Sequence, residues 1–274
     1  MTDAGNAAAV RPLDAVTVRV RAANPSPMTL SGTNTYLVGA PAGAEVVVVD
    51  PGPDLPAHRA TVESAIADLG ARVVAVVVTH HHADHAEAVG WAEQWGVPAY
   101  AFDPRRVPGT RALGDGATLP LAGITLTARH LPGHCSDQLC LQVDQTGAVL
   151  TGDHVLGSGT TVIAWPDGDL EQYLASLGEL EAMRPSALYP GHGEVVDDAV
   201  ARIHELAAHR AQRTAQITSA LGDGPVTVPA IVAQVYPHLD ARLHGAAGRS
   251  VRAHLDVLER QGRAQRTGER WHGT

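Results

Sequence analysis

Short apolar runs, separated by turns rich in glycine and proline, recur through the first 150 residues of this chain. Short valine-rich runs are typical of buried strands, and apolar residues at i, i+4 and i+7 are typical of helices. The spacing of Val62, Ile66 and Leu69 predicts a helix over 57–69, and a second helix is predicted near 86–95. Strands are predicted at Val16–Val20, Tyr36–Val38, Glu45–Asp50, Val73–Val78, Thr125–Ala128, Leu139–Val143 and Ala148–Leu150.

This alternation of strands and helices predicts a sheet covered by helices. The later strands follow one another through tight connections, as in a second sheet. We therefore expect an α/β fold of the four-layer αββα type, in which two sheets lie between layers of helices.

The charge changes near residue 200. Residues 1–200 contain ten arginines and 23 acidic residues, a net charge of −13, whereas residues 201–274 contain ten arginines and six acidic residues, a net charge of +4. Such a change of sign is typical of two modules. We expect one domain over 1–200 and a smaller one over 201–274.

The smaller module is predicted to be mostly helical. A long helix is expected around Ile203 to Leu221, and two more are expected at Val228–Tyr236 and Ala246–Arg260. Gly262 ends the last helix, and Arg263–Trp271 is expected to form a hairpin. Three helices and a terminal hairpin are typical of a winged helix.

A dense group of metal-ligand residues follows the strand predicted at Val73–Val78. Four histidines and one aspartate lie within the seven residues Thr79–His85. Imidazole nitrogen and carboxylate oxygen are ligands that zinc prefers. Three further candidates, His134, Asp153 and His192, each follow an apolar segment and a glycine that lets the backbone turn sharply. The sequence therefore predicts a metal site at the ends of several strands, with enough ligands for two ions.

The pattern His80-x-His82-x-Asp84-His85, followed by His134, Asp153 and His192, resembles the metallo-β-lactamase superfamily. Its signature stretches span residues 34–193. A narrower likeness is to the β-lactamase-like protein 2 family and its bacterial members, and it rests on Gly32–Gly39, Gly152–Gly157 and the C-terminal segment. The resemblance implies the αββα fold with a C-terminal winged helix.

The resemblance also assigns the ligands. It implies that His80, His82 and His134 hold the first metal ion, that Asp84, His85 and His192 hold the second, and that Asp153 bridges the two. Asp84 and Asp153 are the expected catalytic residues, because Asp153 would hold the spacing of the metal ions and Asp84 would help to orient the nucleophile.

Two divalent metal ions are the expected cofactors, most simply Zn²⁺, although mixed nitrogen and oxygen ligands accept other ions. Two such ions about 3.5–4 Å apart can share a bridging hydroxide that is available at neutral pH. The expected activity is metal-dependent hydrolysis.

The sequence does not decide whether the substrate is a small molecule or single-stranded RNA. Members of the resembled family include an endoribonuclease and thioesterases. A thioesterase of the glyoxalase II type, or another ester or lactone hydrolase, would need a cationic site such as Arg105, Arg106 and Arg111. A different class of protein is a nucleic-acid-binding module with a regulatory metal domain. The charge of +4 favours nucleic acid only weakly, and Tyr236 and Trp271 are the only aromatic residues of the tail available for base stacking.

The location expected for this protein is cytoplasmic. Residues 1–15 hold charged residues and lack the apolar core of a secretory signal, and no apolar run approaches the ~20 residues that span a bilayer. No membrane partner is expected, and the oligomeric state is not indicated. The chain has only two cysteines, Cys135 and Cys140, so no disulfide framework is expected.

Overall fold

The computed structural model describes residues 9–40, 44–222 and 224–274, and they fall into two compact units. The first unit contains the described residues up to Leu131 together with Asp137–Gly159 and Arg184–Ala199. The second contains Pro132–Ser136, Thr160–Met183 and Val200–Thr274. The division at residue 200 stays a prediction about domains, and the compact units differ from it by the segments 132–136 and 160–183.

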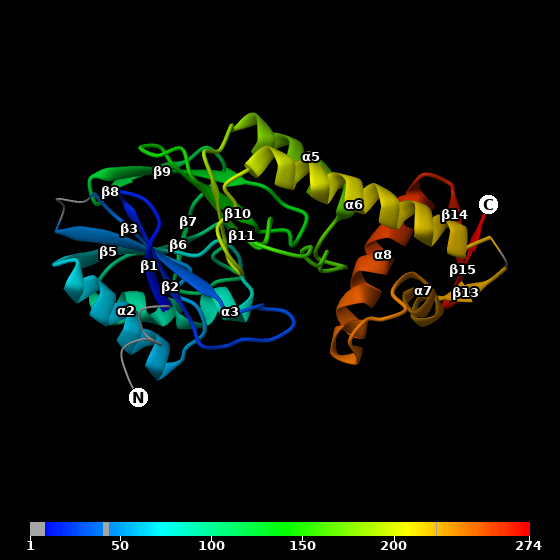
Figure 1. The fold of residues 1–274 in the computed structure, drawn as a ribbon, viewed down its shortest axis with the longest axis horizontal. Coiled ribbons are helices and arrows are strands. Elements are labelled where there is room, and N and C mark those ends of the chain that lie inside the picture. Colours follow the sequence, from blue (N-terminus) through cyan, green and yellow to red (C-terminus); the bar gives the residue numbers. More distant parts are fainter. Residues whose placement is uncertain (1–8, 41–43, 223) are drawn as a thin grey trace. The chain divides into compact units, whose positions relative to one another are not determined.

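The first unit contains a seven-stranded sheet in the order β1-β2-β3-β4-β5-β6-β7 (Figure 1). The strands β1 to β4 pair in antiparallel fashion, and β4 to β7 pair in parallel. Valine-rich β4 and β5 lie in the middle, as their continuous apolar runs predict for strands buried on both faces. The strands are β1 Val10–Pro12, β2 Thr17–Arg21, β3 Asn34–Val38, β4 Glu45–Val49, β5 Arg72–Val77, β6 Ala99–Ala101 and β7 Arg111–Ala112.

A second sheet of the first unit has five strands in the order β12-β11-β10-β9-β8. Side chains from both sheets, among them Val47, Val77, Leu126 and Leu141, form one buried cluster, so the two sheets pack face to face. The strands are β8 Thr118–Leu121, β9 Ile124–His130, β10 Leu139–Val143, β11 Val149–Gly152 and β12 Leu188–Pro190.

The helix α2 (Pro56–Asp68) covers the other face of the seven-stranded sheet. Its Val62 and Ile66 pack with Val48 of β4 and Val76 of β5 in a second buried cluster. The predicted helix over 57–69 is therefore confirmed in type and place.

The helix predicted near 86–95 is confirmed in type but not as one element, because three short helices occupy this region: α3 Ala83–Ala86, η1 Glu87–Gly90 and α4 Trp91–Trp95. The carbonyl oxygen of His82 accepts bonds from the amides of His85 and Ala86, so the first turn begins inside the ligand loop. The amide of Ala88 donates to the carbonyl of Gly52, at 3.1 Å, rather than continuing a helix. A bond to a neighbouring loop has replaced a helical bond, and the axis breaks there.

The C-terminal part of the second unit is built as the sequence predicts for a winged helix. Ile217, Ile231, Leu255 and Trp271 share its buried core. A three-stranded sheet in the order β13-β15-β14 includes the predicted terminal hairpin. The elements are α6 Ala199–Ala220, β13 Val226–Thr227, α7 Val228–Val235, η2 Ala241–Leu243, α8 His244–Arg260, β14 Ala264–Thr267 and β15 Arg270–Gly273 (Figure 1). The helix α5 (Leu170–Ala182) also belongs to the second unit and was not predicted.

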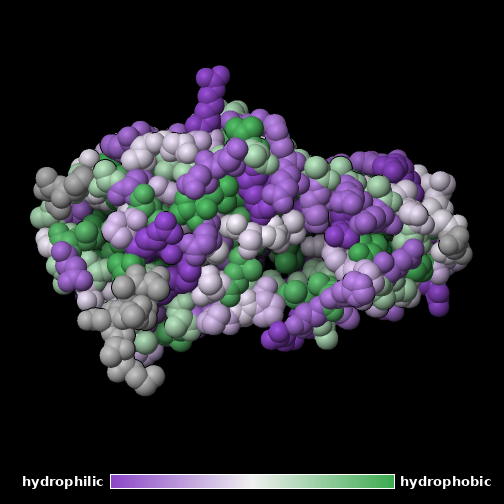
Figure 2. Space-filling model, viewed as in Figure 1, coloured by the Kyte–Doolittle hydropathy of each residue, from purple (hydrophilic) through white to green (hydrophobic). Residues whose placement is uncertain are grey.

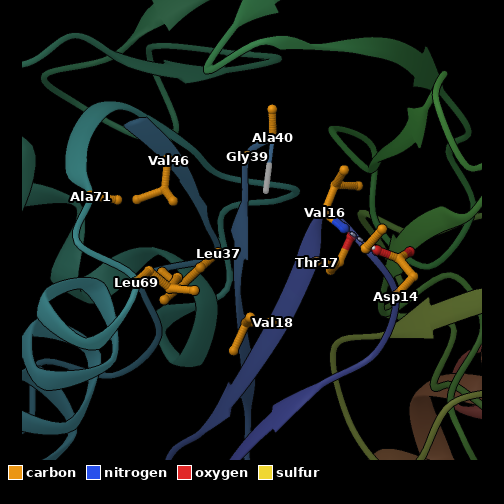
Figure 3. A pocket seen from close by; sticks show the side chains of 11 residues that line it. Asp14, Val16, Thr17, Val18, Leu37, Gly39, Ala40, Val46, Leu69 and Ala71 are labelled. Atoms are coloured by element: carbon orange, nitrogen blue, oxygen red, sulfur yellow. Dashed lines mark hydrogen bonds between the residues drawn. The ribbon is translucent and has the colours of Figure 1, made fainter. Parts of the chain in front are cut away.

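In the part of the chain that the structure describes, no helix combines the length and apolarity needed to cross a membrane. Hydrophilic residues cover much of the face shown in Figure 2. A cavity of about 60 Å³ lies beside β2 and β3, lined among others by Asp14, Val16 and Leu37 (Figure 3), and its lining includes none of the candidate ligands.

Candidate metal centre

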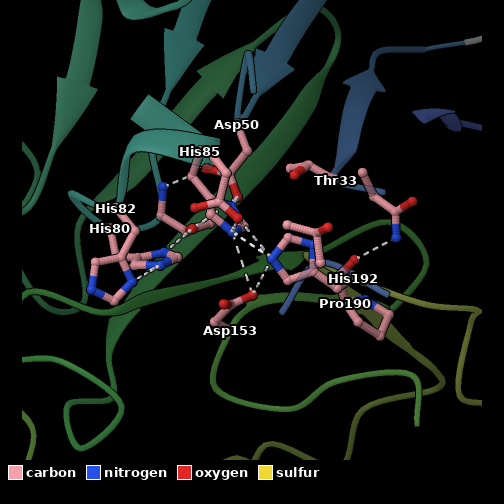
Figure 4. Close-up of polar contacts among 12 residues, drawn as sticks. Thr33, Asp50, His80, His82, His85, Asp153, Pro190 and His192 are labelled. Carbon is pink, nitrogen blue, oxygen red and sulfur yellow. Dashed lines mark hydrogen bonds and ion pairs between the residues drawn. The ribbon is translucent and has the colours of Figure 1, made fainter. Parts of the chain in front are cut away.

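The candidate ligands of the first unit follow the ends of three strands. His80 to His85 follow β5, Asp153 follows β11, and His192 follows β12. The strands β11 and β12 are parallel neighbours, which places Asp153 and His192 at the same sheet edge. Figure 4 shows His80, His82, His85, Asp153 and His192 turned towards a common region.

Two imidazoles and two carboxylates meet most closely around His85 and His192. The Nε2 atoms of these histidines are 3.3 Å apart. Oδ1 of Asp153 lies 3.4 Å from Nε2 of His85 and 3.3 Å from Nε2 of His192. Oδ2 of Asp84 lies 3.1 Å from Nε2 of His192 and 3.8 Å from Nε2 of His85. Four ligand atoms thus converge from three loops.

These separations match those required of metal ligands. Ligand atoms bound about 2.0–2.1 Å from a tetrahedral ion lie about 3.3–3.4 Å from one another. A Cβ atom built on Gly191 would lie 2.5 Å from Cε1 of His85 and 2.8 Å from Oδ1 of Asp153, so a side chain at this position would fill the site. The residues present therefore fit a divalent ion at Asp84, His85 and His192, and these three are also a mutually close ligand group.

A second group lies at the start of the ligand loop. Nε2 of His80 and Nδ1 of His82 are 3.0 Å apart. The ligand atoms of His80, His82 and Asp153 lie within 4.8 Å of one another. Asp153 is thus close both to this pair and to His85 and His192, as a bridging ligand must be.

His134 lies in the second unit, in the segment 132–136. Its Nδ1 donates a hydrogen bond to the carbonyl oxygen of Val162, at 2.6 Å, and lies 2.9 Å from Oγ1 of Thr161. The imidazole is buried, with 4% of the residue exposed. Because Nδ1 carries the donated proton, Nε2 is the nitrogen that a neutral ring offers to a metal.

Asp50 contacts the candidate ligand His85 and the residue before His80, and no sequence motif pointed to it. Its Oδ2 accepts a bond from Nδ1 of His85 at 2.8 Å, and its carboxylate also binds the amide and hydroxyl of Thr79 at 2.7 and 2.8 Å. The residue has a φ of 50°, which non-glycine residues rarely adopt. The sequence pattern predicts Asp50 only as the last residue of a strand that ends before the turn Pro51-Gly52-Pro53. The preceding buried strand was the available signal.

Strand β3 holds the loop that carries His192. The side-chain amide of Asn34 donates to the carbonyls of Pro190 and Gly193, each at 2.9 Å, and the Tyr36 hydroxyl donates to that of Pro190 at 2.7 Å. Arg21 donates to Oδ1 of Asn34 and to the carbonyl of Gly193, both at 3.1 Å. Asn34 and Tyr36 are therefore supporting residues and not ligands.

The charges of the site stabilise one another. Burial alone would lower the pKa of His192, but the Asp153 and Asp84 carboxylates raise it to about 9. Burial likewise opposes protonation of His85, yet Asp153, Asp84 and Asp50 raise its pKa well above the usual value. Burial would raise the pKa of Asp84, and His85 and His192 instead lower it to about 2. The pKa of Asp153 is lowered well below its usual range by the same two histidines, against the effect of burial. Both carboxylates are ionised at neutral pH.

The remaining chemistry-bearing residues have other partners. His81 binds Oδ1 of Asp137 at 2.7 Å, and Nη1 of Arg106 lies 3.1 Å from both of its ring nitrogens. Arg105 pairs with Asp103 at 2.8 Å. Both cysteines are buried free thiols.

Comparison with known proteins agrees with this geometry. Residues 28–192 match the model of the metallo-beta-lactamase superfamily, and residues 227–271 match that of the beta-lactamase-associated winged helix domain. An atrochrysone carboxyl ACP thioesterase from Aspergillus chevalieri is 35% identical over 239 residues, which cover 80% of this chain and 72% of that protein. A beta-lactamase-like protein 2 homolog from Caenorhabditis elegans is 32% identical, with 91% of this chain and 85% of that protein covered.

Solved structures share the whole fold. A beta-lactamase domain protein from Burkholderia ambifaria superimposes with a TM-score of 0.84 at 23% identity, over 100% of this chain and 95% of that one. A metallo-beta-lactamase family protein from Thermus thermophilus gives 0.80 at 25% identity, over 94% and 98%. The chain belongs to the metallo-beta-lactamase superfamily, as a hydrolase of that fold with a C-terminal winged-helix domain.

Proposed function

We propose that this protein hydrolyses thioesters of anionic carriers with the help of two divalent metal ions, most simply zinc. The observation that carries the proposal is the set of converging imidazole and carboxylate atoms around His85, His192 and Asp153. The choice of substrate is supported by relatives named as thioesterases, which are 35% and 34% identical to this chain.

The proposed ligands divide into two sets. His80, His82 and His134 would hold one ion, and Asp84, His85 and His192 the other, with Asp153 between them. The inclusion of His134 is supported by the course of the chain: the segment 132–136 leaves the first unit after Leu131 and returns at Asp137. The Leu131 amide donates to the Gln138 carbonyl at 2.9 Å, which closes the base of this loop. Asp137 contacts His81, the residue between His80 and His82.

Two bound divalent ions would supply an activated water at neutral pH and stabilise negative charge on the carbonyl oxygen. The protein's own groups prepare that chemistry. Asp153, with a side chain 13% exposed, is an ionised acceptor between two histidines. Asp84 has a side chain 30% exposed and is also ionised, so it can accept a hydrogen bond from the nucleophile and orient it. Asp50 and β3 keep the imidazoles from turning.

An anionic carrier is favoured by one charge near the ligand loop. The exposed Arg106 places its guanidinium against His81, one residue from His80 and from His82. A fixed cation there would attract a phosphate or carboxylate of a thiol carrier. The neighbouring Arg105 pairs with Asp103 at 2.8 Å.

Single-stranded RNA is the second candidate substrate. It is favoured by the similarity to beta-lactamase-like protein 2 homologs over 85% of the length of one of them, and by the charge of +4 over residues 201–274. Base stacking finds little support in the tail. Trp271 is buried, with 2% exposed, and the Arg213 guanidinium lies 4.1 Å from the Tyr236 ring centroid. For this reason RNA takes second place, and a purely nucleic-acid-binding role third.

The test compares substrates side by side on the zinc-loaded protein: an acyl thioester, a lactone, a cephalosporin and single-stranded RNA. We expect fast thioester hydrolysis that falls about a thousandfold, equivalent to about 4 kcal/mol, in Asp153→Ala. Asp144→Ala is the control, because Asp144 is an exposed acid whose side chain bonds to Thr127 Oγ1, away from the ligands. Metal analysis should find close to two ions per chain. RNA cleavage with inert thioesters would decide for the second candidate, and full activity of Asp153→Ala would reject the two-metal site.

A further inference from the structure

An irregular segment, residues 161–165, provides the hydrogen-bond partners of His134 within the second unit. The carbonyl of Val162 accepts the bond from His134 Nδ1, at 2.6 Å, and Oγ1 of Thr161 lies 2.9 Å from the same nitrogen. The Ala164 amide donates back to the carbonyl of His134 at 2.9 Å. The orientation of the imidazole, and the nitrogen on which it carries its proton, therefore depend on where this segment lies.

Segment 161–165 is held in place by α6 and α8. The Thr161 carbonyl accepts a bond from Nη2 of Arg210 in α6, at 2.5 Å. The Ile163 amide lies 3.4 Å from Oγ of Ser250 in α8. Nε1 of Trp165 donates to Oδ2 of Asp256, also in α8, at 2.5 Å. Two helices of the C-terminal part thus fix both ends of a segment that has no helical or strand bonds of its own.

Arg210 is the unusual member of this arrangement. It is only 2% exposed, and no acidic side chain pairs with it among the residues that the structure describes. Its guanidinium lies 5.1 Å from the centre of the Tyr173 ring. Burying a guanidinium without a carboxylate costs free energy. A bond to one backbone carbonyl and an aromatic face offset only part of that cost, although a neutral donor would have been enough to fasten the segment.

We propose that Arg210 is a positioning residue for the metal centre, which acts through segment 161–165 to orient His134. The inference rests on the proposed function, because it takes His134 as a ligand. It gives the C-terminal helices a role in metal binding that is separate from any contact with substrate. Residues that bind the outer nitrogen of a ligand imidazole fix its tautomer, and their loss weakens metal affinity by about 10–100-fold.

The experiment measures metal affinity and not turnover. Full-length protein is titrated with zinc against a chelating dye, and the absorption spectrum of the cobalt-substituted protein reports the ligands of each ion. In Arg210→Met we expect one of two metal equivalents to bind about 10–100-fold more weakly. The cobalt spectrum should shift towards that of His134→Ala. Arg210→Lys keeps a donor and a charge and should recover part of the affinity.

Arg213→Met is the matched control. Arg213 lies one turn further along α6, stacks on Tyr236 and donates to the carbonyl of Val235 at 3.0 Å, without touching segment 161–165. It should bind both equivalents like the unaltered protein. Trp165→Phe keeps an aromatic ring beneath the Arg252 guanidinium but removes the indole donor to Asp256, and it should weaken the same equivalent. It replaces Arg210→Met should that variant not fold.

The outcomes separate the two proposals. If His134→Ala loses one equivalent while folded Arg210→Met and Trp165→Phe bind like Arg213→Met, the positioning role is rejected and the metal site stands. If His134→Ala keeps both equivalents at full affinity, His134 is no ligand, and both this inference and that part of the proposed function are wrong.

Discussion

The carboxylate of Asp50 lies 2.8 Å from Nδ1 of His85, on the side of the ring opposite the converging ligand atoms. Because Oδ2 of Asp50 accepts the Nδ1 proton, Nε2 of the neutral ring is free to bind a metal. The same carboxylate binds the backbone and hydroxyl of Thr79, which precedes His80. One acidic side chain thus fixes both ends of the ligand loop.

We therefore predict that Asp50→Asn lowers metal affinity by about 10–100-fold, since the amide loses the charge that orients His85 and holds Thr79. The measurement is competition for zinc with a chelating dye at constant pH. Asp144→Asn, an equal change at an exposed acid, should leave the affinity as it is. An Asp50→Asn protein that matches this control would show that the Asp50 contact is not needed for metal binding.

The hydrogen bonds that Asn34 donates to the loop of His192 contribute to stability separately from the bond that Tyr36 donates. In Asn34→Ala the carbonyls of Pro190 and Gly193 each lose one of their two donors, and we expect the free energy of unfolding to fall by about 2–3 kcal/mol. Tyr36→Phe removes only the bond to Pro190 and should cost about 1 kcal/mol. Urea unfolding of metal-free protein measures both. Equal losses in the two variants would contradict the assignment of two bonds to Asn34.

The strand ends and the winged helix were predictable because each has a local signal. Valine runs mark the strands, and the histidine motif follows one of them directly. Asp50 was not predictable in the same way, because its role depends on His85 and Thr79, which lie about thirty residues away in the chain and come beside it only through the parallel pairing of β4 and β5.

Helix α5 shows a signal that was present and not used. Asp169 caps its first turn by accepting from the amide of Gln172, and Leu170, Tyr173, Leu177 and Leu180 recur on its buried side at helical spacing. The helix near 86–95 differs from its prediction, as three short helices in place of one, for the opposite reason. Its local pattern is helical, but the bond from Ala88 to Gly52 comes from tertiary structure that no local pattern contains.

A substitution of Gly191 tests how much space is available in the candidate metal centre. Gly191→Ala would place a methyl group 2.5 Å from Cε1 of His85, so we expect loss of the ion proposed at Asp84, His85 and His192. Metal content after dialysis should fall from about two ions to about one per chain.

Gly178→Ala is the control for that substitution. Gly178 lies inside α5, and a Cβ there would meet no atom within 4 Å. It should keep full metal content and gain about 0.5–1 kcal/mol of stability, since alanine favours the helix. Retention of both ions in Gly191→Ala would mean that the loop moves aside readily, against the tight geometry described above.

The burial of His58 leads us to predict how the free energy of unfolding depends on pH. The residue is 3% exposed, its Nε2 lies 2.8 Å from Oγ1 of Thr35, and burial lowers its pKa to about 4 from the usual 6.5. Above pH 6.5 the ring is neutral in both folded and unfolded chains. As the pH falls from 6.5 to 4, the unfolded chain takes up a proton that the folded chain refuses, so the free energy of unfolding decreases by roughly 3 kcal/mol.

The measurement is urea unfolding of metal-free protein at pH 7.5 and at pH 4.5, for the natural chain and for His58→Gln. The glutamine cannot take up the proton, so the difference in stability between the two proteins should shrink as the pH is lowered. Other buried histidines, such as His254, whose pKa burial lowers to about 3, act equally in both proteins and cancel in this comparison. A difference that is the same at both pH values would show that His58 is protonated as easily in the folded chain as in the unfolded one.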